Sequence, residues 1–273
     1  MNFLADIIER KKLSLARAKE ARGVEDLRAG AFDVRRAAEP HRLRGALQQG
    51  RLNIIAEVKR ASPSRGLIRA DVSPSLLARA YEAGGAAAVS VLTEEERFQG
   101  SLDDLREVRA AVWIPVLRKD FMFDEFQLYE AAEAGADALL LIVAALDDET
   151  LERLRLLAED ELGMDALVEV HTSEELRRAL ASGASLIGVN NRNLQTFEVS
   201  LDVSAQLVRE MPHDVTRISE SGLRTSSDLN NLRALGYDGF LIGESLMRAH
   251  DPGHALRELL DEAEEAGKAK VKR

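Results

Sequence analysis

The pattern of hydrophobic and polar positions repeats one unit eight times along the chain. Each unit is a short β-branched or leucine-rich run, followed by a stretch with apolar residues three and four positions apart. Such spacing predicts a strand and then a helix. The predicted strands are Asn53–Val58, Ala87–Leu92, Ile114–Leu117, Ala138–Ile142, Ala166–Val168, Leu186–Val189, Val215–Ile218 and Gly239–Ile242. The clearest predicted helices are Ser75–Ala83, Phe126–Ala134, Leu151–Leu162, Ser173–Ala181 and Ser227–Leu235.

Glycine follows several of these helices, at positions where a left-handed residue would cap the last turn. These glycines are Gly84, Gly135, Gly163, Gly183 and Gly236. Apolar strands separated by helices predict a parallel sheet covered by helices, and eight such units suit a closed (β/α)8 TIM barrel of the α/β class. A doubly wound open sheet is the alternative. It is disfavoured because no glycine-rich dinucleotide turn follows the first strand.

The repeats divide the chain into three parts. Residues 51–265 form the predicted barrel, and residues 266–273 form a charged tail. Residues 1–50 form an N-terminal helical extension packed on the barrel, with two predicted helices at Phe3–Ala21 and Val34–Gln49. This extension either stabilises the ring of helices or covers the open end of the barrel as a lid, and the sequence favours neither.

Composition narrows the class of protein. The 273 residues are 45% hydrophobic and 31% charged, without an apolar run long enough to cross a bilayer. With no cysteine and no cleavable leader, we expect a globular cytoplasmic protein without disulfides. The formal charge of −10 is spread over interspersed acidic and basic residues. It therefore argues against nucleic acid or a membrane as a partner, and any bound anion needs a local site.

Polar residues occupy many of the predicted strand ends. In a parallel barrel these ends converge on one face, where active sites lie. A single charged residue there is often only a solvated surface group, but a whole set favours an acid–base site. The set consists of Glu57, Lys59, Lys119, Glu169, Asn190, Arg192, Glu220, Ser221 and Glu244.

Two glycine–serine turns follow the last two strands, at Ser221–Gly222 and Gly243–Ser245. Glycine lets the backbone approach a ligand closely, and barrels often bind phosphate with backbone N–H groups at this place. Each turn alone could be an ordinary loop, but the two together predict a phosphate site. Ser62 and Ser64, after the first strand, could add hydroxyl donors.

Apolar residues near the same face suggest a pocket for a flat group. Phe98, Phe121 and Leu241 could line it, although core packing is an alternative for each. The five histidines show no metal-ligand spacing, so no metal is predicted. His171 is the histidine near the predicted mouth, and we expect it to be solvated or to support another residue.

Long segments at the strand ends carry a family resemblance. They read “IIAEVKRASPSRG”, “SVLTEEERFQGS”, “PVLRKDF”, “LVEVHT”, “IGVNNRNL”, “ISESGL” and “FLIGESLM”. With the Phe3–Lys19 helix, they make the sequence resemble the indole-3-glycerol-phosphate synthase family over nearly the whole chain. The resemblance implies a barrel enzyme of tryptophan biosynthesis, acting without a cofactor on the small phosphorylated substrate 1-(2-carboxyphenylamino)-1-deoxyribulose 5-phosphate. It also leaves room for association with other enzymes of that pathway.

The resemblance also implies roles for individual residues. The catalytic or substrate-orienting positions would be Glu57, Lys59, Lys119, Glu169, Asn190, Glu220 and Ser221. The substrate-binding positions would be Ser62, Phe98, Phe121, Arg192, Gly222, Leu241, Gly243, Glu244 and Ser245. Two positions depart from common family patterns: Asn193 stands where aspartate is frequent, and Glu244 where some members have serine.

The implied reaction closes the indole ring and releases carbon dioxide and water. Ring closure needs an acid, and a protonated lysine can serve when carboxylates hold its charge. We assign this acid to Lys119, while Lys59, oriented by Glu57, faces the substrate carboxylate and Glu169 acts as acid or base in the dehydration. The division between the two lysines stays open. Alternative functions are a class I aldolase, with a Schiff-base lysine, and a non-catalytic barrel that binds a phosphate metabolite.

Overall fold

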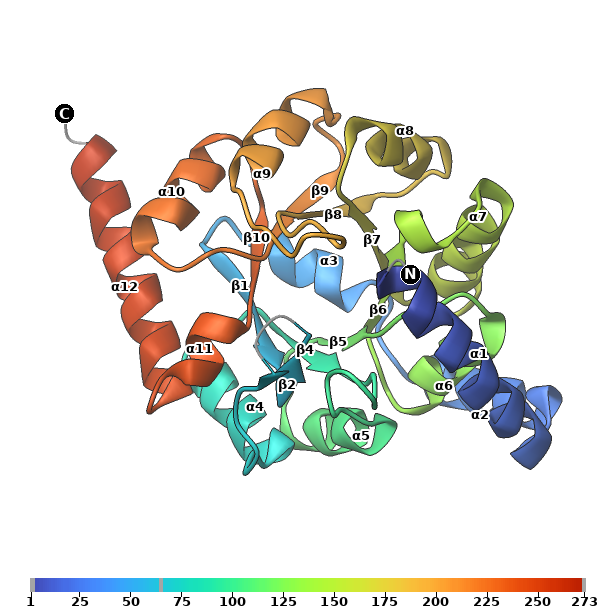
Figure 1. Ribbon diagram of the computed structural model, residues 1–273. Coiled ribbons are helices and arrows are strands. Elements are labelled where there is room, and N and C mark those ends of the chain that lie inside the picture. The colour runs from blue at the N-terminus through green and yellow to red at the C-terminus, as the bar shows by residue number, and fades with distance from the viewer. Residues whose placement is uncertain (1–2, 64–65, 272–273) are drawn as a thin grey trace.

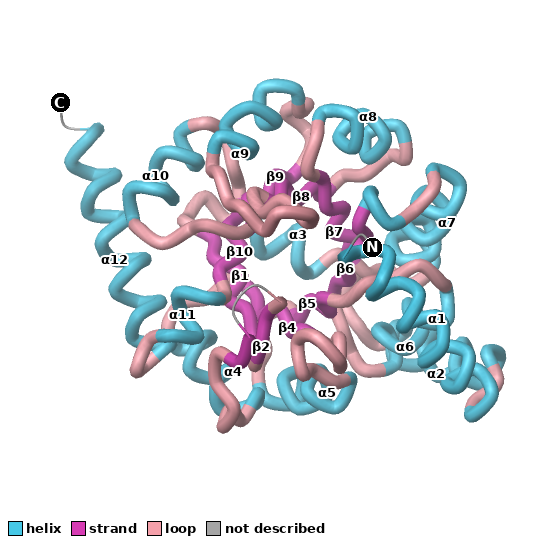
Figure 2. Tube along the Cα trace, viewed as in Figure 1, coloured by secondary structure: helices cyan, strands magenta, loops and turns pink. Residues whose placement is uncertain are grey.

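The computed structural model describes residues 3–63 and 66–271. Within them, eight parallel strands close into a barrel in the order β1-β10-β9-β8-β7-β6-β5-β4, as the ring of strands in Figure 2 shows. The predicted (β/α)8 fold is therefore confirmed. The barrel strands are β1 Asn53–Val58, β4 Ala88–Leu92, β5 Val116–Lys119, β6 Ala138–Ile142, β7 Asp165–Val170, β8 Leu186–Asn190, β9 Thr216–Glu220 and β10 Gly239–Ile242. A separate ladder pairs β2 Ala61–Ser62 with β3 Gly66–Leu67.

Helices surround the barrel (Figure 1). Around it run α4 Pro74–Ala83, α5 Leu102–Ala111, α6 Glu125–Glu133, α7 Asp148–Leu156, α8 Ser173–Ala181, α9 Asp202–Leu207, α10 Ser226–Ala234, α11 Glu244–Arg248 and α12 Pro252–Val271. Three short turns complete the set: η1 Val143–Ala145, the π-helical η2 Leu157–Glu161 and η3 Val208–Glu210. The predicted helix Leu151–Leu162 is thus the end of α7 continued by η2. The predicted charged tail is helical as far as Val271.

Polar side chains begin most of these helices and glycines end several of them. The side chains of Ser73, Ser101, Asp124, Asp147, Thr172 and Thr225 each accept a backbone N–H of the first turn. The predicted left-handed glycines are confirmed at Gly135, Gly163, Gly183 and Gly236. Gly84 is a wrong prediction, because it is right-handed and Gly85 takes the left-handed conformation with φ +96°. A Cβ on Gly84 would lie 2.6 Å from the carbonyl oxygen of Gly253, so Gly84 serves the close approach of α12.

Strand residues alternate between two cores. On β1, Ile54 and Ala56 face the helices, whereas Ile55 faces the inside of the barrel. The inner core also receives Leu43 and Leu47 from α3 Arg42–Leu47. Because side chains alternate along a strand, the residues two positions beyond an inward apolar residue also point inward.

The N-terminal extension differs from the prediction after its first helix. α1 Phe3–Ala21 has the expected bounds, but the predicted helix Val34–Gln49 is wrong. The chain forms α2 Val24–Arg36, which packs on α6, and then α3. Pro40 separates α2 from α3, since proline lacks an N–H and clashes with a preceding helical turn.

Charged side chains close the barrel at the N-terminal ends of the strands. Arg42 donates to both carboxylate oxygens of Asp137 at 3.0 and 3.1 Å, and Arg109 donates to one of them at 2.7 Å. Arg35 donates to three backbone carbonyl groups. Arg42 also donates to the backbone carbonyl of Trp113, whose side chain is 86% exposed. No helix within residues 3–63 and 66–271 is long and apolar enough to cross a membrane.

Candidate active site

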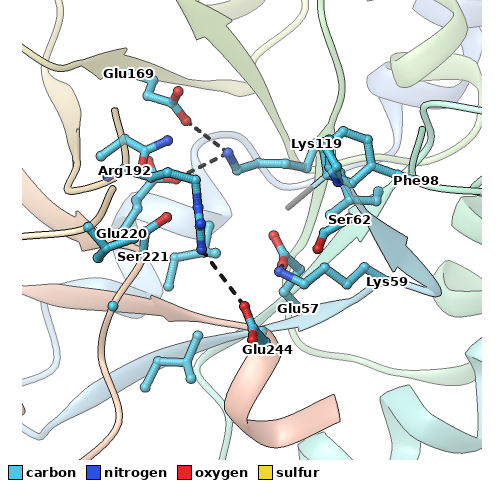
Figure 3. A pocket seen from close by; sticks show the side chains of 18 of the residues that line it. Glu57, Lys59, Ser62, Phe98, Lys119, Glu169, Arg192, Glu220, Ser221 and Glu244 are labelled. Carbon is cyan, nitrogen blue, oxygen red and sulfur yellow. Dashed lines mark hydrogen bonds and ion pairs between the residues drawn. The ribbon is translucent and has the colours of Figure 1, made fainter. Parts of the chain in front are cut away.

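A cavity of about 900 Å³ opens at the C-terminal ends of the strands (Figure 3). All the candidate residues predicted within the described chain line it. They are Glu57, Lys59, Ser62, Phe98, Lys119, Phe121, Glu169, Asn190, Arg192, Glu220, Ser221, Gly222, Leu241, Gly243, Glu244 and Ser245. Ser64 lies outside the described residues. The structure therefore brings together side chains from all parts of the barrel sequence.

Strand alternation explains why these side chains converge. Four charged residues each lie two positions beyond an inward apolar residue: Glu57 follows Ile55, Lys119 follows Leu117, Glu169 follows Leu167 and Glu220 follows Ile218. Four strands end later than predicted. Lys119, Glu169, Asn190 and Glu220 therefore belong to β5, β7, β8 and β9 rather than to the following loops. Ladder hydrogen bonds on rigid strands therefore fix the backbone of the charged groups.

Lys119 lies at the centre of the charge cluster. Its Nζ is 2.9 Å from Glu169 Oε2 and 3.1 Å from Glu220 Oε2. Burial alone would lower the pKa of Lys119, but the charges of Glu169, Glu220 and Glu57 outweigh it and raise that pKa above its ordinary value. Lys119 is therefore an ammonium ion at neutral pH.

The two carboxyl groups beside Lys119 differ in their ionisation. Burial raises the pKa of Glu169, but Lys119, His171 and a hydrogen bond from Asn190 together lower it to about 2. Burial, reinforced by the charge of Glu169, raises the pKa of Glu220 to about 7 although Lys119 opposes this. Two carboxylates at one lysine cannot both be fully satisfied, so one is a stable anion and the other exchanges its proton near neutral pH.

Gly188 on β8 makes room for Glu220. A Cβ at Gly188 would lie 2.1 Å from Glu220 Oε1. That oxygen is buried, and no residue that the structure describes forms a hydrogen bond with it. The sequence analysis missed Gly188, although glycine inside a strand signals the close approach of another group.

A second ion pair joins Lys59, just beyond β1, to Glu57. Lys59 Nζ contacts Glu57 Oε1, and both side chains are largely buried. A Cβ on Gly243 would lie 2.1 Å from Glu57 Oε1 and 2.9 Å from Lys59 Nζ. Gly243 is therefore needed to accommodate this pair as well as to leave the backbone open.

His171 lies behind Glu169. Its Nε2 is 3.4 Å from Glu169 Oε1, and its Nδ1 is 3.0 Å from Glu175 Oε2. Burial lowers the pKa of His171, but the hydrogen bond that its ring donates to Glu175 and the charge of Glu169 raise it more. His171 does not line the cavity, so its place agrees with the supporting role expected from the sequence.

The side of the cavity formed by β9 and β10 carries the predicted phosphate turns. Ser221 and Gly222 both have left-handed backbone, with φ of +68° and +85°. This conformation is strained for serine and is typical of functional sites. Arg192 Nη2 lies 3.8 Å from Glu244 Oε2, and Arg248 also lines the cavity. Arg248 Nε lies 3.3 Å from Glu244 Oε1, so both arginines on this side of the cavity pair with Glu244.

The opposite side of the cavity is apolar. The rings of Phe98 and Phe121 have centroids 6.3 Å apart at an angle of 41°. The sequence analysis missed Phe3, which comes from α1, lines the cavity and packs edge-on against Phe197 at 5.1 Å. No sequence signal links these two aromatic residues, because their contact depends on how α1 lies across the barrel.

The fold and the site together define an acid–base enzyme of the (β/α)8 barrel class. Buried lysines and glutamates face a cavity that also offers an apolar wall and backbone suited to an anion. Among the described residues, no group of three or more His, Asp or Glu is placed to hold a metal ion.

Comparison with known proteins gives the family. The family profile of indole-3-glycerol phosphate synthase matches residues 4–259, so the chain belongs to this family. It is 50% identical to the indole-3-glycerol phosphate synthase of Mycolicibacterium gilvum over 257 residues, covering 94% of this chain and 93% of that protein. It is 51% identical to the indole-3-glycerol phosphate synthase of a Polaromonas species over 217 residues, covering 80% of this chain and 82% of that protein. The chain is thus a carboxy-lyase of tryptophan biosynthesis, and the aldolase and non-catalytic alternatives fall away.

Solved structures show the same fold in more distant proteins. Thiamine phosphate pyrophosphorylase from Pyrococcus furiosus has a TM-score of 0.59 at 18% identity, covering 82% of this chain and 98% of that one. 3-Hexulose-6-phosphate synthase from Salmonella typhimurium has a TM-score of 0.62 at 14% identity, covering 78% of this chain and 99% of that one. At such identities the likeness concerns the fold alone.

Proposed function

We propose that Lys119 is the acid that closes the indole ring of 1-(2-carboxyphenylamino)-1-deoxyribulose 5-phosphate. The observation that carries this proposal is its ammonium group, which lies inside the cavity between two buried carboxylates. A charge held in place before the reaction can stabilise the ribulose oxygen as electrons move onto it, and then donate a proton. When the substrate enters between Lys119 and its carboxylate partners, its carbonyl oxygen comes within reach of the Lys119 proton.

Lys59 holds the substrate carboxylate in this proposal. Its ion pair with Glu57 fixes the ammonium group on the side of the cavity opposite Glu169. Loss of carbon dioxide from the ring-closed intermediate returns the bonding electrons to the ring and restores aromaticity. Lys59 then serves to orient the carboxylate rather than to accept or donate a proton.

Glu169 and Glu220 divide the later proton transfers. Dehydration needs a proton removed from the ring system and a proton given to the departing hydroxyl group. Glu169, with its pKa held at about 2, suits the removal of a proton only when substrate binding displaces Lys119. Glu220, with its pKa raised to about 7, can hold or release a proton at neutral pH. Asn190 and Ser221 complete the polar wall around them.

The phosphate binds at the two glycine turns. Backbone N–H groups of Gly222, Gly243 and the first residues of α11 are its donors, and Arg192 and Arg248 supply positive charge nearby. Ser62 Oγ is buried and has no hydrogen-bond partner within residues 3–63 and 66–271, which leaves this hydroxyl available to the ligand. Because the Glu244 side chain is an anion, its contribution comes from the backbone. Phe98, Phe121 and Leu241 enclose the aromatic ring.

Single-turnover kinetics with saturating authentic substrate test the acid. We expect Lys119→Met to lower the rate of ring closure about a hundredfold or more, the usual size of a lost general acid. Lys59→Met is the matched variant, and its loss should raise the dissociation constant as well as lower the rate. If Lys119→Met closes the ring within about tenfold of the wild-type rate, the acid is another group.

The pathway assignment carries two further predictions. We expect the protein to work in the cytoplasm, and to be able to associate with other tryptophan-pathway enzymes. Both rest on the family and on the charge distribution of the sequence.

A further inference from the structure

Asp120 lies between Lys119 and Phe121 at the end of β5, and all three residues line the cavity. It is 1% exposed, and its Oδ1 accepts the backbone N–H of Phe121 at 2.8 Å. The carboxylate therefore holds the backbone of the turn that carries both the proposed acid and one wall of the aromatic pocket. The reaction itself leaves Asp120 unused.

The partners of Asp120 come from three different parts of the chain. Its Oδ2 accepts the hydroxyl of Thr93 at 2.6 Å and Arg118 Nη2 at 3.2 Å. Its Oδ1, the oxygen that holds Phe121, pairs with Lys11 Nζ at 2.6 Å. Lys11 belongs to α1, so the N-terminal extension is tied directly to the turn beside Lys119.

This ion pair differs from the other ion pairs of α1. The side chains of Lys11 and Asp120 are 15% and 0% exposed. Arg10, Lys12 and Lys19 instead pair with partners at the surface, where ion pairs contribute little to stability. A buried pair has a geometry that solvent does not loosen, and the loss of one partner leaves the other charge buried alone.

The charges around Asp120 are balanced only with Lys11 in place. Two cations, Lys11 and Arg118, face two anions, Asp120 and Glu130, and Arg118 Nη1 lies 3.4 Å from Glu130 Oε2. Without Lys11 the group carries an excess negative charge close to Lys119. Arg118 already contacts both carboxylates, and it reaches Asp120 through Oδ2, so Lys11 is the cation that pairs with Oδ1, the oxygen that holds the Phe121 backbone.

We propose that Lys11 is a positioning residue for ring closure, which acts through Asp120 on the turn that holds Lys119 and Phe121. This inference rests on the proposed role of Lys119. It gives α1 two separate functions: Phe3 covers the cavity, while Lys11 sets the place of the acid from behind.

Steady-state kinetics of three variants test the proposal on the full chain. We expect Lys11→Met to lower kcat about tenfold, because small displacements of reacting groups have large effects on rate. The Michaelis constant should change less than about threefold, since the phosphate turns are untouched. Lys11→Arg keeps the charge and should recover most of kcat. Lys12→Met removes a neighbouring positive charge from the exposed face of α1 and should stay within about twofold of the wild type.

The double variant Lys11→Met/Asp120→Asn covers the case in which Lys11→Met does not fold. It removes both charges and so restores the balance, and we expect it to fold and to remain slow. The proposal is overturned if kcat of Lys11→Met matches that of Lys12→Met, if Lys11→Arg is as slow as Lys11→Met, or if the double variant has the wild-type kcat. Lys119→Met separates the two hypotheses: ring closure that survives it refutes the assigned acid, whatever Lys11 does.

Discussion

The two ends of the barrel bury charged groups in opposite ways. At the N-terminal end, the carboxylate of Asp137 accepts from Arg42, from Arg109 and from the backbone N–H of Val116, so both oxygens are satisfied. At the C-terminal end, Glu169 and Glu220 compete for Lys119, and Glu220 Oε1 has no hydrogen-bond partner among the described residues. The Asp137 carboxylate thus has a full set of partners, whereas Glu169 and Glu220 share one lysine and leave one carboxylate oxygen unpaired within the described part of the chain.

This difference separates groups that hold the fold from groups that await a ligand. Buried polar atoms in proteins are nearly always hydrogen-bonded, so an unpaired oxygen in a cavity requires an explanation. A bound substrate provides one at the C-terminal end. We therefore expect substitutions at the N-terminal end to change stability, and substitutions at the C-terminal end to change activity.

Asp137→Asn should give the largest change in stability. Loss of the Asp137 negative charge leaves Arg42 and Arg109 without their shared anion. This should lower the free energy of unfolding by about 3 kcal/mol. The kcat of the folded protein should stay unchanged. Urea unfolding at neutral pH measures the effect. The control is Asp33→Asn, which removes the carboxylate of an exposed ion pair with Arg36. A large loss of kcat in folded Asp137→Asn would remove the distinction between the two ends.

Gly243→Ala, at the C-terminal end of the barrel, should lower the activity by a similar free energy. The new Cβ cannot coexist with the Lys59–Glu57 pair, and it narrows the backbone approach to phosphate. We expect kcat/KM to fall about a hundredfold, close to 2.7 kcal/mol, with the melting temperature nearly unchanged. Gly45→Ala is the matched control, because a Cβ there meets nothing within 4 Å.

Inorganic phosphate provides an independent check on the same turns. It should compete with substrate in the wild type and compete less well in Gly243→Ala. Equal competition in both proteins would mean that the phosphate lies elsewhere.

Glu220 should make the C-terminal end less stable as pH rises. Its pKa of about 7 in the folded protein exceeds that of an unfolded glutamate, so between about pH 5 and pH 7 the folded chain binds more protons than the unfolded chain. The free energy of unfolding should therefore fall over this range by something on the order of 2 kcal/mol. Glu220→Gln should abolish this part of the pH dependence and lower kcat. Identical slopes of stability against pH in both proteins would contradict the raised pKa.

Phe3→Ala should have the smallest effect and tests the lid. Loss of the ring that packs on Phe197 should raise the Michaelis constant about fivefold, equivalent to about 1 kcal/mol, without loss of stability. The exposed Leu13→Ala on the same helix is the control. Deletion of residues 1–40 is a poorer test, because it also removes Leu27 and Ala31 of α2 from the core. An unchanged Michaelis constant in Phe3→Ala would remove the lid function of α1 and leave only the Lys11–Asp120 contact to link this helix to the site.

Periodicity predicted the barrel because eight short apolar runs are each followed by a stretch with the spacing of a helix. It also placed the candidate residues correctly, since strand ends in a parallel barrel must converge. It ended β5, β7, β8 and β9 too early, because the next residues are polar but continue a buried ladder, namely Lys119, Glu169, Asn190 and Glu220. Local pattern cannot tell a polar residue at a strand end from the start of a loop.

The N-terminal extension was harder to predict because its order depends on contacts made far away. α2 has few apolar residues. Leu27 and Ala31 are buried because α2 packs on α6, which lies about 100 positions further along the chain. The predicted helix Val34–Gln49 ignored the effect of Pro40. Lys11 and Asp120 stand 109 positions apart, by the difference of their numbers, and only the folded chain brings them together.

The exposed indole of Trp113 gives this protein a convenient optical property. It is the only tryptophan in the sequence, and it lies at the end of the barrel away from the cavity. Its emission should report neither the arrival of substrate nor the movement of the turns around it. Fluorescence that grows during turnover therefore comes from the newly made indole of the product, against a background that stays constant. The wild-type chain can be assayed continuously with light, without first removing its own fluorophore.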